Sequence, residues 1–429
     1  MSCAFVFSSA ASMRAPALRG AASRNSLGAM LHAAPRPRVK TLRQLYRGTM
    51  RRNRNVVLVA LFGIALASDA DAQSSARSSE PARLRGTIDL SIGQADESRD
   101  PYIFGAIDGL TMDAQGRIIV ADRKDHNVRV FDATGRHLYT IGRKGRGPGD
   151  LDTPCCLTID KHGMLWIKEN GNHRYSEFRL GATDATFVRS IRGTTNSAWT
   201  ADRVDFDPKG RIVDLGSVFV PATKTYRIAR LHIDSTGTVE RDMVPEPPAD
   251  SLDSFSFATK SGTASYWQPY GAKALRAFGA GGEMAHAVSS NYAVTWVDAL
   301  GKRRALLQRA AVAAPELSAK ERKSTDELLD AIAKNTGVAR AKLPLTIPSR
   351  KSPLEALGFD MDGRLWVVRS VAGGQPGEAD LYDRTGKWIA IMQWPADVTM
   401  HGWTVRGRTG IGVAKDEDGA ERVVRVQFR

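Results

Sequence analysis

Short runs of β-branched and aromatic residues follow polar turns along most of this chain, and each turn ends in glycine. The first example is Asp113-Ala-Gln-Gly116 followed by Arg117-Ile-Ile-Val120. The turn glycines recur as Gly116, Gly163, Gly210, Gly363 and Gly410. The intervals between the first three, and between the last two, are each 47 residues. A repeat of roughly this length with several short strands is typical of a β-propeller.

Each repeat except the last holds four short runs that are suited to strands, separated mostly by Asp and Gly turns of the kind that tight hairpins require. Together with a weaker fourth repeat at Gly282, the glycines predict six blades over residues 84–429. The last repeat supplies only three strands and ends at Val423–Phe428, whereas Leu84–Ile92 precedes the first repeat. We expect Leu84–Ile92 to complete the last blade, because this pairing removes two open sheet edges. The predicted fold is therefore an all-β, six-bladed β-propeller closed by an N-terminal strand.

One segment departs from the β pattern, between the fourth and fifth blades. Ser318-Ala-Lys-Glu321 forms a capping box, and Leu328, Leu329 and Ile332 fall on one helical face. Gly337 supplies a stop signal. We predict a helical insertion at about 315–340 that packs on one face of the ring.

The N-terminal region has the anatomy of an export signal. Met50-Arg-Arg-Asn-Arg54 is a basic head, Val56–Ala67 is an apolar run too short to span a bilayer, and Ala70-Asp-Ala72 is a small-x-small cleavage site. The alternatives are an uncleaved anchor and a chance apolar run. Residues 50–72 thus predict a signal peptide, and 73–83 a flexible lead-in. Residues 1–49 are either a non-native leader before a true start at Met50 or a transit peptide.

The basic charge is concentrated in this leader. The whole chain carries a formal net charge of +15, but residues 1–72 hold 11 Lys and Arg against two acids, which leaves +6 for the remainder. A basic excess in a removable segment does not indicate nucleic-acid binding. We therefore predict a periplasmic or secreted protein without a nucleic-acid partner, and without membrane insertion after cleavage.

The repeats also resemble a known family. Ala121-Asp122 followed by His126-Asn-Val-Arg-Val-Phe131 resembles the NHL repeat, as does Asn170–Arg174 with Phe178 downstream. Gly142–Asp150 is similar to the blade-linking loop of bacterial secreted six-bladed NHL-like propellers. The resemblance covers about 84–429 and implies a six-bladed propeller. It implies no single activity, because NHL-like propellers include binding platforms and enzymes.

The resemblance implies two possible enzyme activities, because two groups of enzymes have six-bladed propellers of this kind. Gluconolactonase-like lactonases hold a divalent cation with Glu, Asn and Asp, and NHL-type amidating lyases hold zinc with His. The candidates near the channel mouth here are Asp122, Lys168, Glu169, Asp214 and Arg369 at the ends of second strands, with His401 on the innermost strand of blade six. A metal cage needs converging acids or imidazoles, and cations among them favour a solvated rim. We assign no metal, no cofactor and no catalytic residue.

Two further features keep alternatives open. Adjacent Cys155 and Cys156 are either two buried small residues or a vicinal disulfide. Tyr266, Trp267 and Tyr270 lie out of register with the repeats, and an exposed aromatic cluster there would suit sugar or peptide binding.

The sequence thus predicts a monomeric, non-catalytic binding or scaffold propeller outside the cytoplasm. It would hold a peptide, a glycan or a protein partner on one face or in the channel. The alternative is a metal-dependent lactonase- or lyase-like enzyme with its site in the channel. A structural repeat within a larger envelope assembly is a third option.

Overall fold

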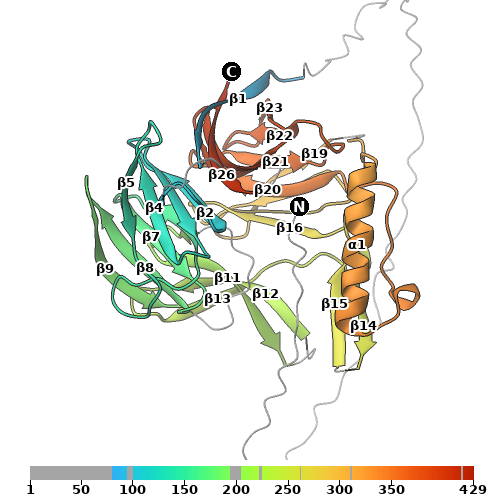
Figure 1. The fold of residues 1–429 in the computed structure, drawn as a ribbon. Helices are drawn as coiled ribbons and strands as arrows, with labels where there is room; N and C mark the ends of the chain where they lie inside the picture. Colours follow the sequence, from blue (N-terminus) through green and yellow to red (C-terminus); the bar gives the residue numbers. More distant parts are fainter. Residues whose placement is uncertain are drawn as a thin grey trace, which may run out of the picture. The chain divides into compact units, whose positions relative to one another are not determined.

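The computed structural model describes residues 80–93, 100–193, 204–221, 225–260, 262–309, 312–416 and 419–429 (Figure 1). The predicted leader, the predicted signal peptide and residues 73–79 of the lead-in lie outside the described residues. None of the described helices is both long and apolar enough to cross a membrane.

Six four-stranded antiparallel sheets follow one another along the chain. Blades one and two are β2 (Ile107–Met112), β3 (Ile118–Asp122), β4 (Asn127–Phe131), β5 (His137–Ile141), and β6 (Pro154–Ile159), β7 (Met164–Glu169), β8 (Arg174–Leu180), β9 (Ala185–Arg192). Blades three and four are β10 (Asp205–Phe206), β11 (Ile212–Val220), β12 (Thr225–Ile233), β13 (Val239–Met243), and β16 (Ala274–Phe278), β17 (Met284–Val288), β18 (Ala293–Val297), β19 (Arg303–Gln308). Blades five and six are β20 (Leu354–Phe359), β21 (Leu365–Arg369), β22 (Gly377–Tyr382), β23 (Trp388–Trp394), and β24 (Val398–Arg406), β25 (Thr409–Lys415), β26 (Glu421–Phe428) with β1 (Arg83–Ile92).

The N-terminal strand closes the ring, as predicted. β1 pairs antiparallel with β26, from Gly86 opposite Phe428 to Ile92 opposite Val423. Its first three residues also pair in parallel with β23, with Arg83 opposite Ile391. The strand therefore completes blade six and joins it to blade five in one hydrogen-bonded sheet.

Buried apolar clusters join every neighbouring pair of blades. In ring order, members of each cluster from its two blades are Ile119 and Leu157, Trp166 and Leu231, Leu215 and Met284, Trp296 and Phe359, Trp366 and Val426, and Ile411 and Ile118. Trp166 and Trp366, which occupy matching positions in blades two and five, both pack between blades. Each large side chain buried in this way contributes about 1.5–3 kcal/mol, so the six interfaces and not the individual hairpins hold the ring together.

The turn of blade six differs from the prediction. Gly410 lies within β25, opposite Val405, and the tight turn is formed by Gly407 and Arg408. Gly407 has a φ of 59°, as a two-residue hairpin requires, whereas blades one, two, three and five use the longer Asp-x-x-Gly turn and blade four uses Gly279-x-x-Gly282. The 47-residue interval from Gly363 to Gly410 therefore does not connect equivalent positions, and that part of the repeat prediction was wrong.

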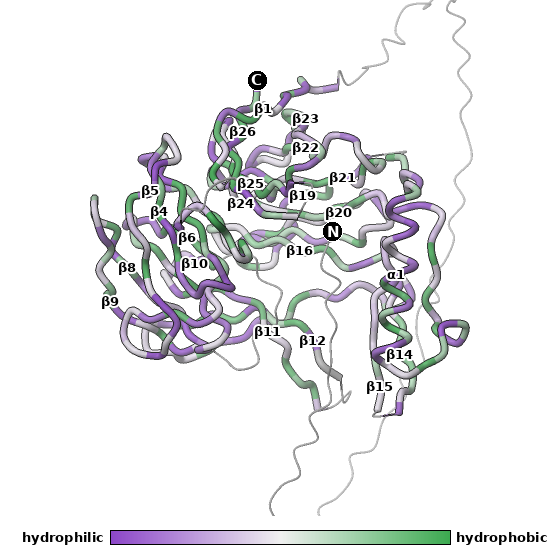
Figure 2. Tube along the Cα trace, viewed as in Figure 1, coloured by the Kyte–Doolittle hydropathy of each residue, from purple (hydrophilic) through white to green (hydrophobic). Residues whose placement is uncertain are grey.

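Two insertions pack together beside blades four and five. Helix α1 (Ala319–Thr336) begins at Ser318 with both hydrogen bonds of the predicted capping box, and ends at Gly337. The hairpin of β14 (Ser254–Thr259) and β15 (Gly262–Trp267), which was not predicted, lies between blades three and four. Hydrophilic residues predominate along α1 (Figure 2).

We call residues 254–267 and 319–347 the cap. Its core contains Leu329 and Ile332 from α1, Tyr266 from the hairpin, and Leu343 with Leu345 from the segment that follows. Tyr266 is therefore buried and not part of an exposed aromatic cluster. Trp267 and Tyr270 are exposed, at 42% and 38%. The cap thus has a small apolar core that is distinct from the six between the blades.

Candidate functional site

The propeller has two unlike faces. Turns between first and second strands lie beside turns between third and fourth strands, as the proximity of Gly116 to Ala133 and of Gly282 to Ala299 shows. We call this side the turn face. The links between blades and the turns between second and third strands lie at the other end of the sheets, which we call the link face. Both cap segments are inserted into links, so they belong to the link face.

A third addition to the repeat also lies at the link face. Strands β11 and β12 of blade three are nine residues each, and they pair from Ile212 with Ile233 to Val220 with Thr225. The equivalent pair in blade one has five residues per strand. The longer hairpin projects in the same direction as β14 and β15 (Figure 1). Phe219, near its end, is 48% exposed.

The last residue of the second strand is buried in blades one and two. Asp122 is fully buried and accepts hydrogen bonds from the backbone N–H groups of Gly105 at 2.7 Å and Ala106 at 3.1 Å in the incoming link. It also accepts from the backbone N–H groups of Lys124 and Asp125 in the following turn. This carboxylate satisfies backbone donors of two loops at once, so it fixes the link to the turn.

Glu169 occupies the same position in blade two. One oxygen accepts from Arg174 Nε at 2.8 Å and from the Ser176 hydroxyl, and the other from Asn172 Nδ2 at 2.6 Å and from the backbone N–H of Asp152 at 3.2 Å. Only 1% of Glu169 is exposed. The expected solvated rim is therefore wrong for Asp122 and Glu169. Both are buried structural acids.

Lys168 and Asp214 form an ion pair between blades two and three. Lys168 Nζ lies 2.7 Å from Asp214 Oδ2, and both side chains are almost completely buried. The hydroxyl of Tyr175 donates to the same carboxylate oxygen. Burial, together with the negative charge of Asp214, raises the pKa of Tyr175 well above its ordinary value. The structure therefore brings together two of the predicted site residues, Lys168 and Asp214, as a buried ion pair.

Arg369 reverses the arrangement of blade two. It is the last residue of β21, opposite Leu354 and Glu378, just as Glu169 is opposite Pro154 and Arg174. In blade two the second strand ends in an acid, Glu169, and the third strand has an arginine opposite it, Arg174. In blade five the two residue types are exchanged, as Arg369 and Glu378. An arginine has no acceptor for backbone N–H groups of the incoming link. Blade five therefore lacks the carboxylate that closes this corner in blades one and two.

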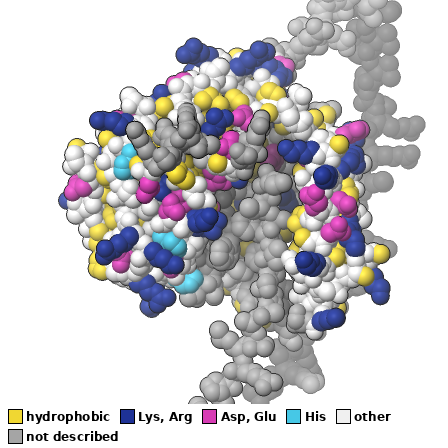
Figure 3. All heavy atoms as spheres, viewed as in Figure 1, with side chains coloured by type: hydrophobic (Ala, Val, Ile, Leu, Met, Phe, Trp, Pro, Cys, Tyr) yellow, Lys and Arg dark blue, Asp and Glu magenta, His cyan; other side chains and the backbone are white. Residues whose placement is uncertain are grey.

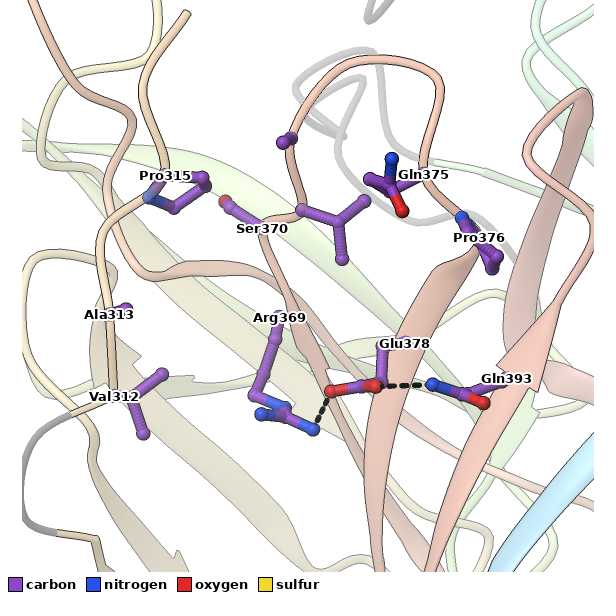
Figure 4. Close-up of a pocket in the computed structure, with 11 residues that line it drawn as sticks. Val312, Ala313, Pro315, Arg369, Ser370, Gln375, Pro376, Glu378 and Gln393 are labelled. Carbon is purple, nitrogen blue, oxygen red and sulfur yellow. Dashed lines mark hydrogen bonds and ion pairs between the residues drawn. The ribbon is translucent and has the colours of Figure 1, made fainter.

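A pocket of about 330 Å³ opens at this corner (Figure 4). Its lining comes from the link after blade four, the turn after β21 and the adjoining ends of β22 and β23, namely Val312, Ala313, Pro315, Arg369, Ser370, Val371, Ala372, Gln375, Pro376, Glu378 and Gln393. Glu378 accepts from Arg369, from Gln393 Nε2 at 2.7 Å and from Arg83 at 3.0 Å. Pockets at the small end of the usual range take a small ligand or one end of a larger one.

A buried polar cluster lies beside the pocket. Fully buried Asp380 accepts from the Tyr292 hydroxyl and from Arg309 Nη1, each at 2.6 Å. The hydroxyls of Tyr292 and Tyr382 are 2.9 Å apart. Burial raises the pKa of Tyr382 to about 12, and burial and Asp380 raise that of Tyr292 further. Burial lowers the pKa of Arg369, and Arg309 adds to this effect despite the opposing charge of Asp380.

His401 lies on the channel side of blade six. The register of β24 on β25 shifts between Met400 and Val405, so His401 lies within an irregular part of the strand. Its ring stacks on Trp403 with centroids 4.2 Å apart. The imidazole is exposed although it is on the innermost strand, and the protein around it lowers its pKa to about 4. The cause is desolvation by the surrounding protein, which disfavours the charged imidazolium.

Cys155 and Cys156 lie on β6, and their sulfur atoms are at bonding distance. Both residues are buried, at 4% and 6% exposed, and Cys156 has a φ of 51°. They face the apolar cluster between blades two and three. Among the residues that the structure describes, no three His, Cys, Asp or Glu side chains come together as metal ligands would.

Comparison with known proteins agrees with this architecture. Residues 97–176, which contain blade one and most of blade two, match a family described as a 6-bladed beta-propeller. The chain is a six-bladed β-propeller. The match is consistent with the resemblance to NHL-like propellers on which the sequence prediction rested. No curated protein is significantly similar to the chain in sequence.

Several solved structures are similar in fold. A protein from Bacteroides fragilis that is described as exported is 10% identical, with a TM-score of 0.45 over 81% of this chain and 95% of that one. Virginiamycin B lyase from Staphylococcus aureus is 12% identical, with a TM-score of 0.40 over 80% and 99%. The calcium-binding protein regucalcin from Agrobacterium tumefaciens is 12% identical, with a TM-score of 0.37 over 81% and 97%. Likenesses at this level extend no activity to this chain.

Proposed function

We propose that this protein is an exported binding propeller that holds a partner on its link face. The partner is a peptide, a glycan or a protein, and the protein acts in the periplasm or outside the cell. One observation carries the proposal. The cap and the long β11–β12 hairpin are additions to the repeat, and both lie at the link face, where the pocket beside Arg369 also opens.

The physical argument is that a ring needs none of these additions to close. Loops carried on a rigid repeat scaffold are where binding residues are usually found. Exposed Phe219 and Trp267 stand on the two hairpins of this face. Acidic and basic side chains are interspersed on the surface in Figure 3, together with scattered apolar ones.

The test compares matched substitutions on the two faces. The labelled mature chain is applied to peptide and glycan arrays, together with Phe219→Ala and Trp267→Ala on the link face. Leu300→Ala is the control, because Leu300 is 93% exposed in the turn between β18 and β19, at the turn face. We expect binding that the two link-face substitutions weaken and the control leaves unchanged. Binding that responds only to Leu300→Ala would contradict the proposal.

A second candidate is catalysis in the channel, which the exposed, neutral His401 favours. A metal-dependent lactonase- or lyase-like activity would require a bound divalent cation. Elemental analysis of the purified protein, with thermal unfolding in calcium, zinc and EDTA, tests this form of the hypothesis. A stoichiometric metal whose removal lowers the melting temperature would support it, and the absence of both effects would count against it.

A further inference from the structure

The corner of blade five is the place where the propeller exchanges a structural acid for an arginine. From this exchange we propose that the pocket beside Arg369 is a carboxylate site that takes the C-terminal end of a peptide. The proposal deepens the proposed function and rests on it, because it names the chemistry of a partner at the link face.

Arg369 has hydrogen-bonding capacity to spare. A guanidinium carries five N–H donors. The contacts described for Arg369 all use Nη2, with Glu378 as the hydrogen-bond acceptor and Asp380 at 3.6 Å. Its Nε is buried and has no hydrogen-bond partner among the described residues. A buried donor without a partner is costly, and a ligand oxygen would satisfy it.

Charged side chains of both signs are equal in number in the cluster around Arg369. Three guanidinium groups, those of Arg83, Arg309 and Arg369, contact three carboxylates, those of Glu80, Glu378 and Asp380. Glu378 accepts hydrogen bonds on both carboxylate oxygens, whereas Asp380 accepts two on Oδ2 and its Oδ1 has no hydrogen-bond partner among the described residues. A ligand carboxylate would therefore be held by the hydrogen-bond donors that Arg369 has to spare, and not by an excess of positive charge. Arginine is well suited to this role because its planar fork matches a carboxylate.

The remaining walls favour a peptide over a sugar acid. The side chains that line the pocket include no Trp, Tyr or Phe on which a sugar ring could stack, and most are small and apolar. Val312 and Ala313 lie outside any strand, and neither forms a backbone hydrogen bond with another described residue. Free backbone groups beside an extended ligand are the means by which peptides are recognised through their main chain.

Calorimetry on the mature chain provides the test, with N-acetylalanyl-alanine as the probe. We compare the free acid with its C-terminal amide, and use glucuronate as a sugar acid. Arg369→Gln removes the guanidinium that is proposed to bind the carboxylate. Arg369→Lys keeps the positive charge but lacks the planar guanidinium. Arg408→Gln is the control, because it removes the same charge from an exposed turn at the opposite face. Circular dichroism checks that each variant is folded.

We expect the free acid to bind, and the affinity for the amide to be lower by a factor of about ten or more. Arg369→Gln should bind the free acid more weakly than the wild type by a similar factor. Arg369→Lys should recover part of this affinity, and Arg408→Gln should have the affinity of the wild type. Equal binding of acid and amide, or undiminished binding to folded Arg369→Gln, would overturn the proposal. Binding of glucuronate but not of the peptide would overturn the peptide assignment in favour of a sugar acid.

The two proposals fail differently. A lack of binding by every carboxylate probe, alongside array binding that responds to Phe219→Ala and Trp267→Ala, would refute only the carboxylate site. Array binding that does not respond to any link-face substitution would refute the proposed function as well.

Discussion

Substituting the equivalent corner residues of blades two and five should affect stability very differently. In Glu169→Gln, whichever carboxylate oxygen becomes an amide nitrogen then faces two donors, either Arg174 with Ser176 or Asn172 with the backbone of Asp152. Hydrogen bonds to a charged group are worth about 1.5–3 kcal/mol each. Breaking a buried ion pair from one side costs about 3–5 kcal/mol. We therefore expect Glu169→Gln to lose about 3–5 kcal/mol of unfolding free energy.

Arg369→Gln should cost about 1 kcal/mol or less, because the acids it leaves keep other donors. Glu378 retains Gln393 and Arg83, and Asp380 retains Arg309 and Tyr292. At about 2.1 cal/mol/K per residue, a ring of roughly 350 residues has an unfolding entropy near 0.7 kcal/mol/K. The expected fall in melting temperature is then about 4–7 °C for Glu169→Gln and about 1 °C for Arg369→Gln.

The assay is guanidinium unfolding followed by tryptophan fluorescence and circular dichroism, which must coincide for a two-state treatment. Glu240→Gln is the control, because Glu240 has a 65% exposed side chain paired with Arg211. Exposed pairs contribute about 0–1 kcal/mol. If Arg369→Gln lost as much stability as Glu169→Gln, Arg369 would be a structural residue, and the reasoning that assigns it to a ligand would be refuted.

Four further predictions follow from buried or enclosed groups. Lys168→Met should lose about 3–5 kcal/mol by leaving its acid partner buried and unpaired, and denaturant unfolding measures this. The imidazole of His401 should titrate near pH 4 in NMR spectra, well below 6.5, and substitution by Gln identifies its signal. Because the folded protein binds this proton less readily than the unfolded chain does, the contribution of His401 to stability should be lost as the pH falls from about 6.5 to 4. Leu329→Ala should remove hydrogen-exchange protection from the cap and leave that of the blades; loss throughout would show that the cap is part of the ring core. Alkylation of Cys155 and Cys156 should require reductant, and labelling of the unfolded, unreduced chain would contradict a vicinal disulfide.

The blade number and the capped helix could be predicted because they depend on local rules, and the closing strand because the last repeat is one strand short. Asp and Gly turns at fixed spacing define the hairpins, and Ser318 with Glu321 defines a helix start. The turn at Gly407 was missed because equal spacing was taken as equal structure. The hairpin β14–β15 was also missed, although Phe255 and Phe257 alternate with polar residues in the way a half-buried strand does.

The candidate site could be predicted only in part. Strand ends identified Arg369, but not Glu378, Asp380 or Arg309, because these contacts bring together residues from different strands and blades. Arg83, for example, reaches Glu378 across 295 positions of sequence. The usable signal was the exchange of partners, acid then arginine in Glu169 and Arg174 and the reverse in blade five. Burial of the corner acids also depends on links whose paths the sequence does not specify.

The most direct measurement of the carboxylate site is a crystal structure of the mature chain soaked with N-acetylalanyl-alanine. We expect difference density for its carboxylate within about 3 Å of the Arg369 guanidinium, with the peptide running along Val312 and Ala313. Density for the peptide elsewhere, such as beside His401 in the channel, with the corner of blade five unchanged, would contradict the account.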